Sequence, residues 1–565
     1  MKRVSGLHPN IHRVQRKLAA GLLVGLALAG MTQHAGAQDL EGAGEGPAVT
    51  VDGNAGARMV AYAADGISRR RTPFSYILSG AVNVNLYDLA FPFSFTFSEQ
   101  ERQLSQPFNQ FGASPRYRWA TAHLGYRNLT FSPFTLAGHQ ILGAGVELNP
   151  GNFRLGFIAG RLNRAVEEDT TGLGTPAYER TGFSGRIGYG SEATHIDLIV
   201  LKAQDDSSSL RRHPTLNDVR PAENLVLGAS GRATIIDGLS IHGDFAVSDY
   251  TRDTRSDVID LPAEAAALGD VIPPRASTQI YTALTAGLAL NIGTFNMGAS
   301  YSRVDPDYKS MGAYYLANDI ESFTVTPSVG LLRNALYLNG SFSMQTDNLQ
   351  GKKRATTRRI VPGLTVAYSP TTEFGITAQF NDMITSQEAG RLPLNDTTRM
   401  AQRSPTVMLS PRYTVGDSTM IHNLYGAVTW QGMVDNNAFT SEFTEYSSIG
   451  ADLSYNVAFP ATGLSLGATV TTHRLENFGG DYTSTGFSLN GAAPFLNNTL
   501  NVSAAAGMSF HADGGTLNAS TGAGWKPTKN HTINLNLSLT ASRHSDAIRQ
   551  SIHEYITVLS YVYTF

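Results

Sequence analysis

The 565-residue sequence contains no cysteine, carries few charges and has no long apolar run beyond its N-terminus. Without cysteine there is no disulfide framework, no thiolate metal site and no cysteine nucleophile. Charged residues make up only 16% of the chain, against about 25% in typical soluble domains. The formal net charge of -3 gives no reason to expect a nucleic-acid partner. Since no later stretch approaches the roughly 18 apolar residues of a spanning helix, a helical membrane protein is excluded.

The N-terminus has the three parts of a secretory signal peptide. Basic residues precede an apolar stretch at 18–30, and Ala35-Gly36-Ala37 forms a small-residue cleavage site. A membrane anchor is the alternative, although the apolar stretch is too short to span a bilayer. No cysteine follows it, so lipoprotein acylation is not expected. We therefore expect cleavage of residues 1–37 near Ala37, a short segment at 38–56 and one folded domain at 57–565.

Tight turns recur along the chain from about residue 140, with longer polar segments between them. Gly, Pro, Asn and Asp supply the backbone conformations that tight hairpin turns need. The short and long connections are expected to alternate strictly, as in a membrane barrel with short turns on one side and long loops on the other. The longest predicted loops are 166–179, 206–222, 253–278, 306–320, 347–357 and 386–402. The ten predicted turns centre on 149–151, 190–192, 237–238, 293–294, 333–334, 369–370, 416–417, 460–461, 497–498 and 527–528.

The segments between the turns alternate apolar and polar side chains. In 531–542 four aliphatic residues alternate with Thr, Asn and Ser, and 239–248 repeats the pattern. A soluble β-sandwich also alternates, because one face packs and the other is solvated. However, the polar face here is Ser, Thr, Asn and Gly far more than Lys and Glu. The predicted strands also reach the about 9–11 residues that a tilted strand needs to cross a bilayer, so a membrane barrel is favoured.

The sequence ends on an aromatic-faced strand, Tyr555–Phe565. Leu559, Tyr561, Tyr563 and Phe565 fall on one face because strand side chains alternate. This strand resembles the C-terminal recognition signal of Gram-negative outer-membrane β-barrels, in which the last strand ends in Phe or Trp with aromatic residues two and four positions before. An ordinary buried final strand is the alternative. The resemblance implies a cell outer-membrane location, a periplasmic position for 38–56, recognition of these four residues by the barrel assembly machinery, and contact with lipid and lipopolysaccharide.

The predicted fold is all-β, a single large antiparallel up-and-down barrel of about 26 strands, with 24–26 favoured. The chain from residue 140 supplies most of them, and the strands before it are expected at 57–64, in a hairpin of 74–86 with 89–98, and in a hairpin of 116–126 with 129–136. Closing 26 strands gives a cylinder roughly 50 Å across. Such a lumen needs a filler, because an open one would breach the membrane. Since 38–56 is too short for a plug domain, the candidates are in-folded loops at 99–115 and 252–278, or a partner protein.

Two His-x-Asp pairs and one basic cluster are the candidate site residues. His195 with Asp197, and His242 with Asp244, are predicted to face the lumen, where each pair could meet a cation or a solute. The alternative is a polar lumen that happens to contain them. A basic cluster in a predicted connection has the Arg geometry that suits lipopolysaccharide phosphates, unless it is an ordinary solvated loop. Its members are Lys352, Lys353, Arg354, Arg358 and Arg359.

No catalytic residue, cofactor site or metal site is predicted, and an enzyme is not expected. The aromatic-dense segment 91–164 loosely resembles segments of large outer-membrane proteins of the Bacteroidota, which implies no particular chemistry. The oversized barrel favours a gated or loop-constricted transport pore. The alternative is a non-transporting structural or secretion-complex component, whose lumen is plugged by a periplasmic or surface protein.

Overall fold

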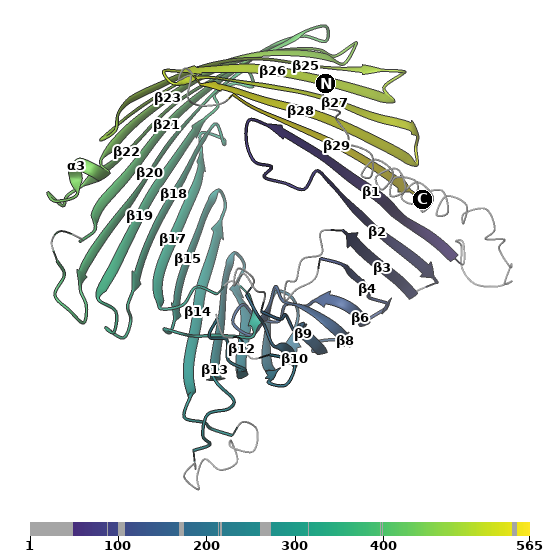
Figure 1. Ribbon diagram of the computed structural model, residues 1–565, viewed down its shortest axis with the longest axis vertical. Coiled ribbons are helices and arrows are strands. Elements are labelled where there is room, and N and C mark those ends of the chain that lie inside the picture. The colour runs from purple at the N-terminus through teal and green to yellow at the C-terminus, as the bar shows by residue number, and fades with distance from the viewer. Residues whose placement is uncertain are drawn as a thin grey trace, which may run out of the picture.

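The chain forms one closed ring of antiparallel strands (Figure 1). This computed structural model describes residues 49–565 except 88, 100–107, 169–174, 213, 215–216, 260–272, 315, 396, 398 and 545–550. The expected signal peptide therefore lies outside the described residues. Consecutive strands pair around the ring, and the first strand, β1 (Val49–Asp65), pairs with the last, β29 (Ile552–Thr564), through 12 register pairs. Closure leaves the sheet without free edges.

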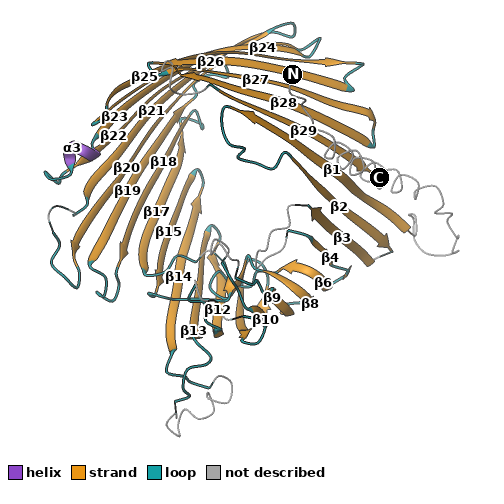
Figure 2. Cartoon of the chain, viewed as in Figure 1, coloured by secondary structure: helices purple, strands orange, loops and turns teal. Residues whose placement is uncertain are grey.

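The remaining wall strands follow one another around the ring in chain order. Figure 2 shows strand throughout the ring and, among the described residues, helix only at α3 (Ser441–Thr444). No helix in the described ranges is long and apolar enough to cross a membrane. The strands are β2 (Phe74–Leu86), β3 (Leu89–Ser98), β4 (Gln110–Ala113), β5 (Arg116–Tyr117), β6 (Ala120–Asn128), β8 (Gln140–Leu148), β9 (Phe153–Asn163), β10 (Glu179–Gly190), β11 (His195–Asp206), β12 (Glu223–Ile236), β13 (Leu239–Thr251), β14 (Thr278–Ile292), β15 (Phe295–Val304), β17 (Ile320–Leu331), β18 (Leu336–Asp347), β19 (Ala355–Tyr368), β20 (Phe374–Ala389), β21 (Ala401–Gly416), β22 (Ile421–Asp435), β23 (Tyr446–Phe459), β24 (Leu464–Asn477), β25 (Gly480–Phe495), β26 (Leu500–His511), β27 (Gly514–Thr528) and β28 (His531–His544).

The ring has 26 strand positions, because two of its 27 strand segments share one position. Both β4 and β5 lie between β3 and β6, so they form one strand that is interrupted at Pro115, which has no N–H to donate to a ladder. The predicted fold class and strand number are confirmed. The predicted hairpin of 116–126 with 129–136 is wrong. Residues 116–126 fall into two strands, β5 and β6, and residues 129–136 do not form a wall strand. The first strand begins at Val49 instead of residue 57.

Nine of the ten predicted turns lie at the expected hairpin ends, and the tenth lies slightly later, at 529–530. The expected strict alternation of short and long connections is wrong at two places. Residues 478–479 and 512–513 are two-residue connections at the end of the ring that otherwise carries the long loops. At the first, Asn477 Oδ1 accepts the Gly479 N–H at 2.8 Å and Gly480 has a φ of 110°, a backbone angle that favours glycine. This local geometry closes the hairpin without a loop.

The wall has an apolar outward face and a polar inward face. Outward-facing Ile187, Ile196 and Ile280 are 68%, 62% and 70% exposed, which suits contact with lipid. On the inward face of β26 and β28, Ser503 and Asn536 are also exposed, so the described chain does not cover that part of the lumen. The main hydrophobic core lies elsewhere, on the inner side of β8–β15.

The seam between β1 and β29 is covered on its outer side by the C-terminal aromatic residues. The rings of Tyr563 and Phe565 stack with centroids 5.6 Å apart. Ala55, opposite Tyr563 in the register, is 9% exposed, and a Cβ on Gly53 would lie 3.1 Å from Phe565 Cζ. The Phe565 and Gly53 backbones also exchange hydrogen bonds of 2.9 and 3.0 Å. The last strand thus pairs with the first, as closure of the ring requires, and Leu559, Tyr561, Tyr563 and Phe565 share the outward face.

Candidate functional site

Two connections fold onto the inner wall instead of projecting from the ring. Residues 129–139 follow β6, and residues 305–319 follow β15; we call them the in-folded segments. They meet through a short parallel pair, β7 (Leu136–Ala137) with β16 (Gly312–Ala313). The two segments therefore narrow the lumen along one sector of the wall.

Apolar side chains hold the in-folded segments against the wall. Leu136 and Tyr308 are 0% and 1% exposed, and they share one cluster with Ile158, Leu201 and Val226 of β9, β11 and β12. The ring of Phe134 meets that of Tyr308 edge-on, with centroids 6.2 Å apart. Burying one large apolar side chain contributes about 1.5–3 kcal/mol. The cluster is therefore the main force that keeps the two segments in place.

Small wall residues make room for this contact. A Cβ on Gly156 would lie 2.9 Å from the ring of Phe131, and one on Gly228 would lie 2.6 Å from Thr135 Cγ2. Both distances are too short for real carbon contacts. The wall surface under segment 129–139 is thus complementary in shape to the segment, and larger residues at Gly156 or Gly228 would push the segment inward.

Polar contacts fix the register of segment 305–319 on the wall. The Met311 N–H donates to Asn224 Oδ1 at 3.0 Å, and Ser248 Oγ donates to the Lys309 carbonyl at 2.7 Å. Asn224 Nδ2 donates to Ser248 Oγ at 2.8 Å, and both side chains are fully buried. Between the segments, Tyr308 Oη donates to the Phe134 carbonyl at 2.8 Å. A buried group that loses such a partner costs about 1–3 kcal/mol.

An ionic network lies on the same inner wall, toward the short turns. Arg154 makes a two-pronged contact with Asp197, with Nε and Nη2 each 2.9 Å from a carboxylate oxygen. Glu147 accepts from Arg186 at 3.2 Å and lies 3.1 Å from His123 Nε2. The Arg186 guanidinium also lies 5.0 Å from the centroid of Phe131. The network supports the wall directly beneath the in-folded segments.

The first predicted lumen pair does not converge on a common ligand position. Asp197 is 2% exposed and is neutralised by Arg154. His195 shares the inward face but lies next to the short turn, where its Nδ1 is 2.9 Å from the Ser191 carbonyl. Asp197 therefore has a structural partner already.

The second predicted pair lies on the inward face of β13. His242 is exposed, and a Cβ on Gly287 of β14 would lie 2.6 Å from its ring, while Asp244 is half-buried. No metal-binding group of three or more His, Asp or Glu side chains occurs in the part of the chain that the structure describes. The possible role of this pair in meeting a solute stays a prediction.

His139 is a buried ionisable group of the in-folded segments. It is 2% exposed, and its ring stacks on Tyr314 with centroids 4.3 Å apart. Burial is the main cause that lowers the pKa of His139 to about 4; the Gln140 carbonyl at 3.1 Å partly offsets it, and the nearby charge of Arg180 adds a smaller lowering effect. The ring is therefore neutral at pH 7, and its protonation would oppose the in-folded arrangement.

The predicted basic cluster is divided between a loop and a strand. Lys352, Lys353 and Arg354 lie in the loop after β18, where Lys353 Nζ forms an ion pair with Asp319 at the end of an in-folded segment. The expectation that Arg358 and Arg359 lie in the connection is wrong, because both belong to β19 and extend its pairing with β20. By alternation Arg358 faces outward and Arg359 inward. Contact of the outward-facing members with lipopolysaccharide stays a prediction.

The in-folded segments are not the loops that the sequence predicts as lumen fillers, 99–115 and 252–278. Residues 110–113 and 116–117 are part of the wall, and 100–107 lie outside the described residues. The flanks of 252–278 pair with each other, through a bridge of Val258 with Arg275, and extend the β13–β14 hairpin away from the ring (Figure 1). Residues 260–272 lie outside the described residues. The one local signal is in segment 129–139, where the apolar residues Leu129, Phe131, Phe134 and Leu136 do not keep a continuous two-residue period; it argues against a strand but does not indicate the contact with 305–319.

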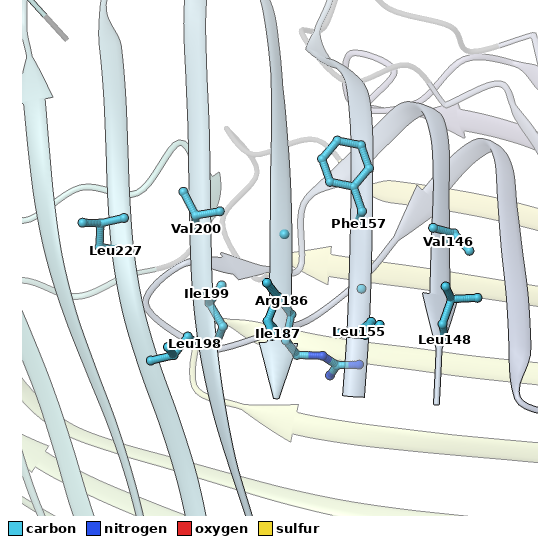
Figure 3. Close-up of a pocket in the computed structure, with 12 residues that line it drawn as sticks. Val146, Leu148, Leu155, Phe157, Arg186, Ile187, Leu198, Ile199, Val200 and Leu227 are labelled. Carbon is cyan, nitrogen blue, oxygen red and sulfur yellow. The ribbon is translucent and has the colours of Figure 1, made fainter. Parts of the chain in front are cut away.

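An apolar groove lies on the outer side of the same wall sector (Figure 3). It lies over Gly185, where a Cβ would be 3.6 Å from Val200 Cγ1 and 3.7 Å from Phe157 Cδ2. The absence of a side chain at Gly185 leaves the depression between its neighbours. Its lining suits lipid acyl chains, and it includes Val146, Leu148, Leu155, Ile187, Leu198 and Leu227.

The closed ring, its apolar outer face and its polar inner face define a large β-barrel of the membrane-spanning kind. No family model and no curated protein sequence matches the chain. Among solved structures, the translocation pore of the P pilus usher PapC aligns at 10% identity and a TM-score of 0.37, over 91% of this chain and 99% of that one. The FrpB iron transporter from Neisseria meningitidis aligns at 12% identity and 0.34, over 91% and 81%. OccAB2 from Acinetobacter baumannii aligns at 10% identity and 0.31, over 61% and 92%. Similarities this low assign neither function nor substrate.

Proposed function

We propose that this protein is an outer-membrane pore whose passage is narrowed by the in-folded segments. The observation that carries the proposal is the packing of 129–139 and 305–319 on one sector of a polar inner wall that the described chain leaves uncovered at β26 and β28. A loop-constricted pore needs a polar inner surface, because a polar lining lowers the cost of passing hydrated solutes.

The outer-membrane location is supported by the outward apolar face and by strand length. Wall strands such as β13 and β29 have 13 residues each, more than the about 9–11 that a tilted strand needs. The aromatic C-terminal strand and the expected signal peptide agree with export and with insertion by the barrel assembly machinery. Lys352, Arg354 and outward-facing Arg358 are proposed to contact lipopolysaccharide phosphates, because guanidinium and ammonium groups bind phosphate oxygens.

We propose that the in-folded segments act as a gate, because side-chain contacts hold them on the wall and they are not themselves strands of the wall. Their attachment rests on the apolar cluster and on a few buried hydrogen bonds, including those of Asn224 and Ser248. Releasing them would leave all 26 strand positions paired. The constriction can therefore open without opening the barrel wall.

Single-channel conductance in planar bilayers tests this proposal, and the cysteine-free chain permits a disulfide lock. Gly312 and Leu201 are the positions to pair, because a Cβ on Gly312 would touch Leu201 Cδ1. We expect the variant Gly312→Cys/Leu201→Cys to show fewer large openings when oxidised than when reduced. Each single-cysteine variant is the matched control. Absence of any conductance, both in the native chain and after replacing 306–318 with a short Gly-Ser linker, would contradict the proposal.

The second candidate is a non-transporting component of the envelope, plugged by a periplasmic or surface protein. The exposed inward face of β26 and β28 is the observation that favours it. A protein plug would cover those residues, so a stoichiometric partner should copurify and should protect Ser503→Cys from a thiol reagent. Ala504→Cys, on the outward face of the same strand, is the control. We propose no catalytic activity for the barrel.

A further inference from the structure

A pocket of about 510 Å³ lies next to the in-folded segments, at the end of the wall that carries the long loops. Its floor comes from strand ends, with Arg180 of β10, Asp205 of β11 and Tyr250 of β13. By alternation these three side chains lie on the inward face. Lys309, from in-folded segment 305–319, completes one side. The pocket therefore opens toward the lumen and away from the lipid-facing surface.

The pocket has more positive than negative charge. Arg180, Arg220, Arg252 and Lys309 line it together with two carboxylates. Both carboxylates already have a two-pronged arginine partner: Asp205 pairs with Arg180 at 2.8 and 3.0 Å, and Asp218 pairs with Arg220 at 3.1 and 3.0 Å. Among the described residues, Arg252 and Lys309 have no carboxylate within 4.0 Å. These two positive charges of the lining are thus available to an anionic group.

Aromatic residues complete the lining. Lys309 Nζ lies 5.2 Å from the ring centroid of Tyr250, which positions the ammonium group over the ring face. Tyr178 is 3% exposed, and its buried hydroxyl has no hydrogen-bond partner among the described residues. Buried hydroxyl groups are normally hydrogen-bonded, so an acceptor oxygen near Tyr178 would be stabilising.

We propose that this pocket binds a small organic anion, with its carboxylate or phosphate group held by Arg252 and Lys309. The guanidinium fork of Arg252 matches two oxygens of such a group, and Lys309 adds a second charge-assisted contact. The proposal rests on the proposed pore function, and it names the class of solute that the pore admits. Because Lys309 belongs to an in-folded segment and Arg252 to the β13–β14 connection, a bound anion also bridges the constriction to the wall.

Equilibrium binding to the purified barrel in detergent tests the proposal. The probes are succinate and inorganic phosphate, titrated at constant ionic strength so that general screening does not change. We expect saturable binding of at least one of them to the native chain. Arg252→Gln and Lys309→Gln should each weaken it about tenfold, since one charge-assisted hydrogen bond accounts for at least that factor. Lys352→Gln, in a loop outside the pocket, should leave binding unchanged. Heat-modified mobility on gels confirms that each variant is folded.

The outcomes separate this inference from the proposed function. No saturable binding of either probe, or equal binding by the folded double variant Arg252→Gln/Lys309→Gln, would overturn the anion site while leaving the conductance experiment unaffected. If the native chain binds a probe and the double variant does not, the anion site is supported. If that same barrel does not conduct, the pore function is refuted and the anion site is not. Binding in detergent free of lipopolysaccharide also excludes a lipid phosphate as the required ligand.

Discussion

Replacing Asn224 with alanine should release segment 305–319 from the barrel wall. The side chain is fully buried and makes three hydrogen bonds: Nδ2 donates to Ser248 Oγ at 2.8 Å and to the Asp249 carbonyl at 3.0 Å, and Oδ1 accepts the Met311 N–H at 3.0 Å. The substitution leaves the Met311 N–H buried without an acceptor. It leaves the strand pairing of β12 with β11 and β13 intact, because that pairing uses backbone groups.

The magnitude follows from the groups that lose their partners. An unsatisfied buried donor or acceptor costs about 1–3 kcal/mol. The Met311 N–H bears this cost in full, and the half-buried Asp249 carbonyl regains part of its hydrogen bonding from water. A total of about 2–4 kcal/mol follows, and about 2.7 kcal/mol corresponds to a hundredfold change in an equilibrium constant. The released fraction of the segment should therefore rise by about two orders of magnitude.

Thiol labelling measures this fraction directly in a chain that has no cysteine of its own. Met311→Cys, a position that is 5% exposed, serves as the reporter because it keeps the backbone N–H of residue 311. Its labelling rate should rise about a hundredfold when Asn224→Ala is added, and larger conductance levels should become more frequent. Asn536→Ala, an inward and exposed asparagine on β28, is the control. A labelling rate that changes less than threefold would refute the assignment of Asn224 as an anchor.

Three further predictions concern protonation, closure and the ionic network. The pKa of His139 is lowered to about 4 in the structure and is about 6.5 in a released chain, so the in-folded state should lose stability as the pH falls from about 6.5 toward about 4. Labelling of Met311→Cys should accelerate over that pH range, and a His139→Leu variant should show no such pH dependence. Gly53→Val should lower the temperature at which the barrel unfolds on heat-modified gels, because its side chain would meet Ala81 O and Phe565, whereas Val51→Ala, exposed at 48%, should have little effect. Arg154→Ala should destabilise the barrel by about 3–5 kcal/mol in urea, since Asp197 is then a buried charge without a partner; equal stability of Arg154→Ala and Arg154→Ala/Asp197→Ala would contradict this.

The regular part of the wall could be predicted from the sequence because its signals are local. Turns such as 237–238 and 293–294 need residues that adopt unusual backbone angles, and the side-chain period of two marks each intervening strand. The hairpin of β2 and β3 has the predicted bounds for the same reason. Even the pairing of β29 with β1 follows from a general requirement, since a strand edge cannot remain open in a bilayer.

The constriction could not be predicted, because it depends on contacts between distant parts of the chain. Nothing local to Tyr308 indicates that its hydroxyl donates to the Phe134 carbonyl, 174 positions away in sequence. Residues 129–136 are apolar enough to resemble a strand, and only the lack of alternation and Pro133 argue otherwise. The His-x-Asp pairs show the reverse problem, because alternation places Asp197 on the inward face but does not reveal Arg154, which lies two strands away across Gly188.

The joining of β1 to β29 has a consequence for how the protein is made. Tyr62 Oη donates to Glu554 at 2.6 Å across 492 positions of sequence, so β1 must keep an unpaired edge until synthesis has almost reached residue 565. Bringing such distant ends together costs about 5 kcal/mol of chain entropy. This cost is modest because it grows only with the logarithm of the sequence separation. Pairing between such distant strands is slow. During that time the exposed edge of β1 can pair with other chains. Binding of β1 by a chaperone during that interval should therefore raise the yield of closed barrel more than it changes the stability of the finished one.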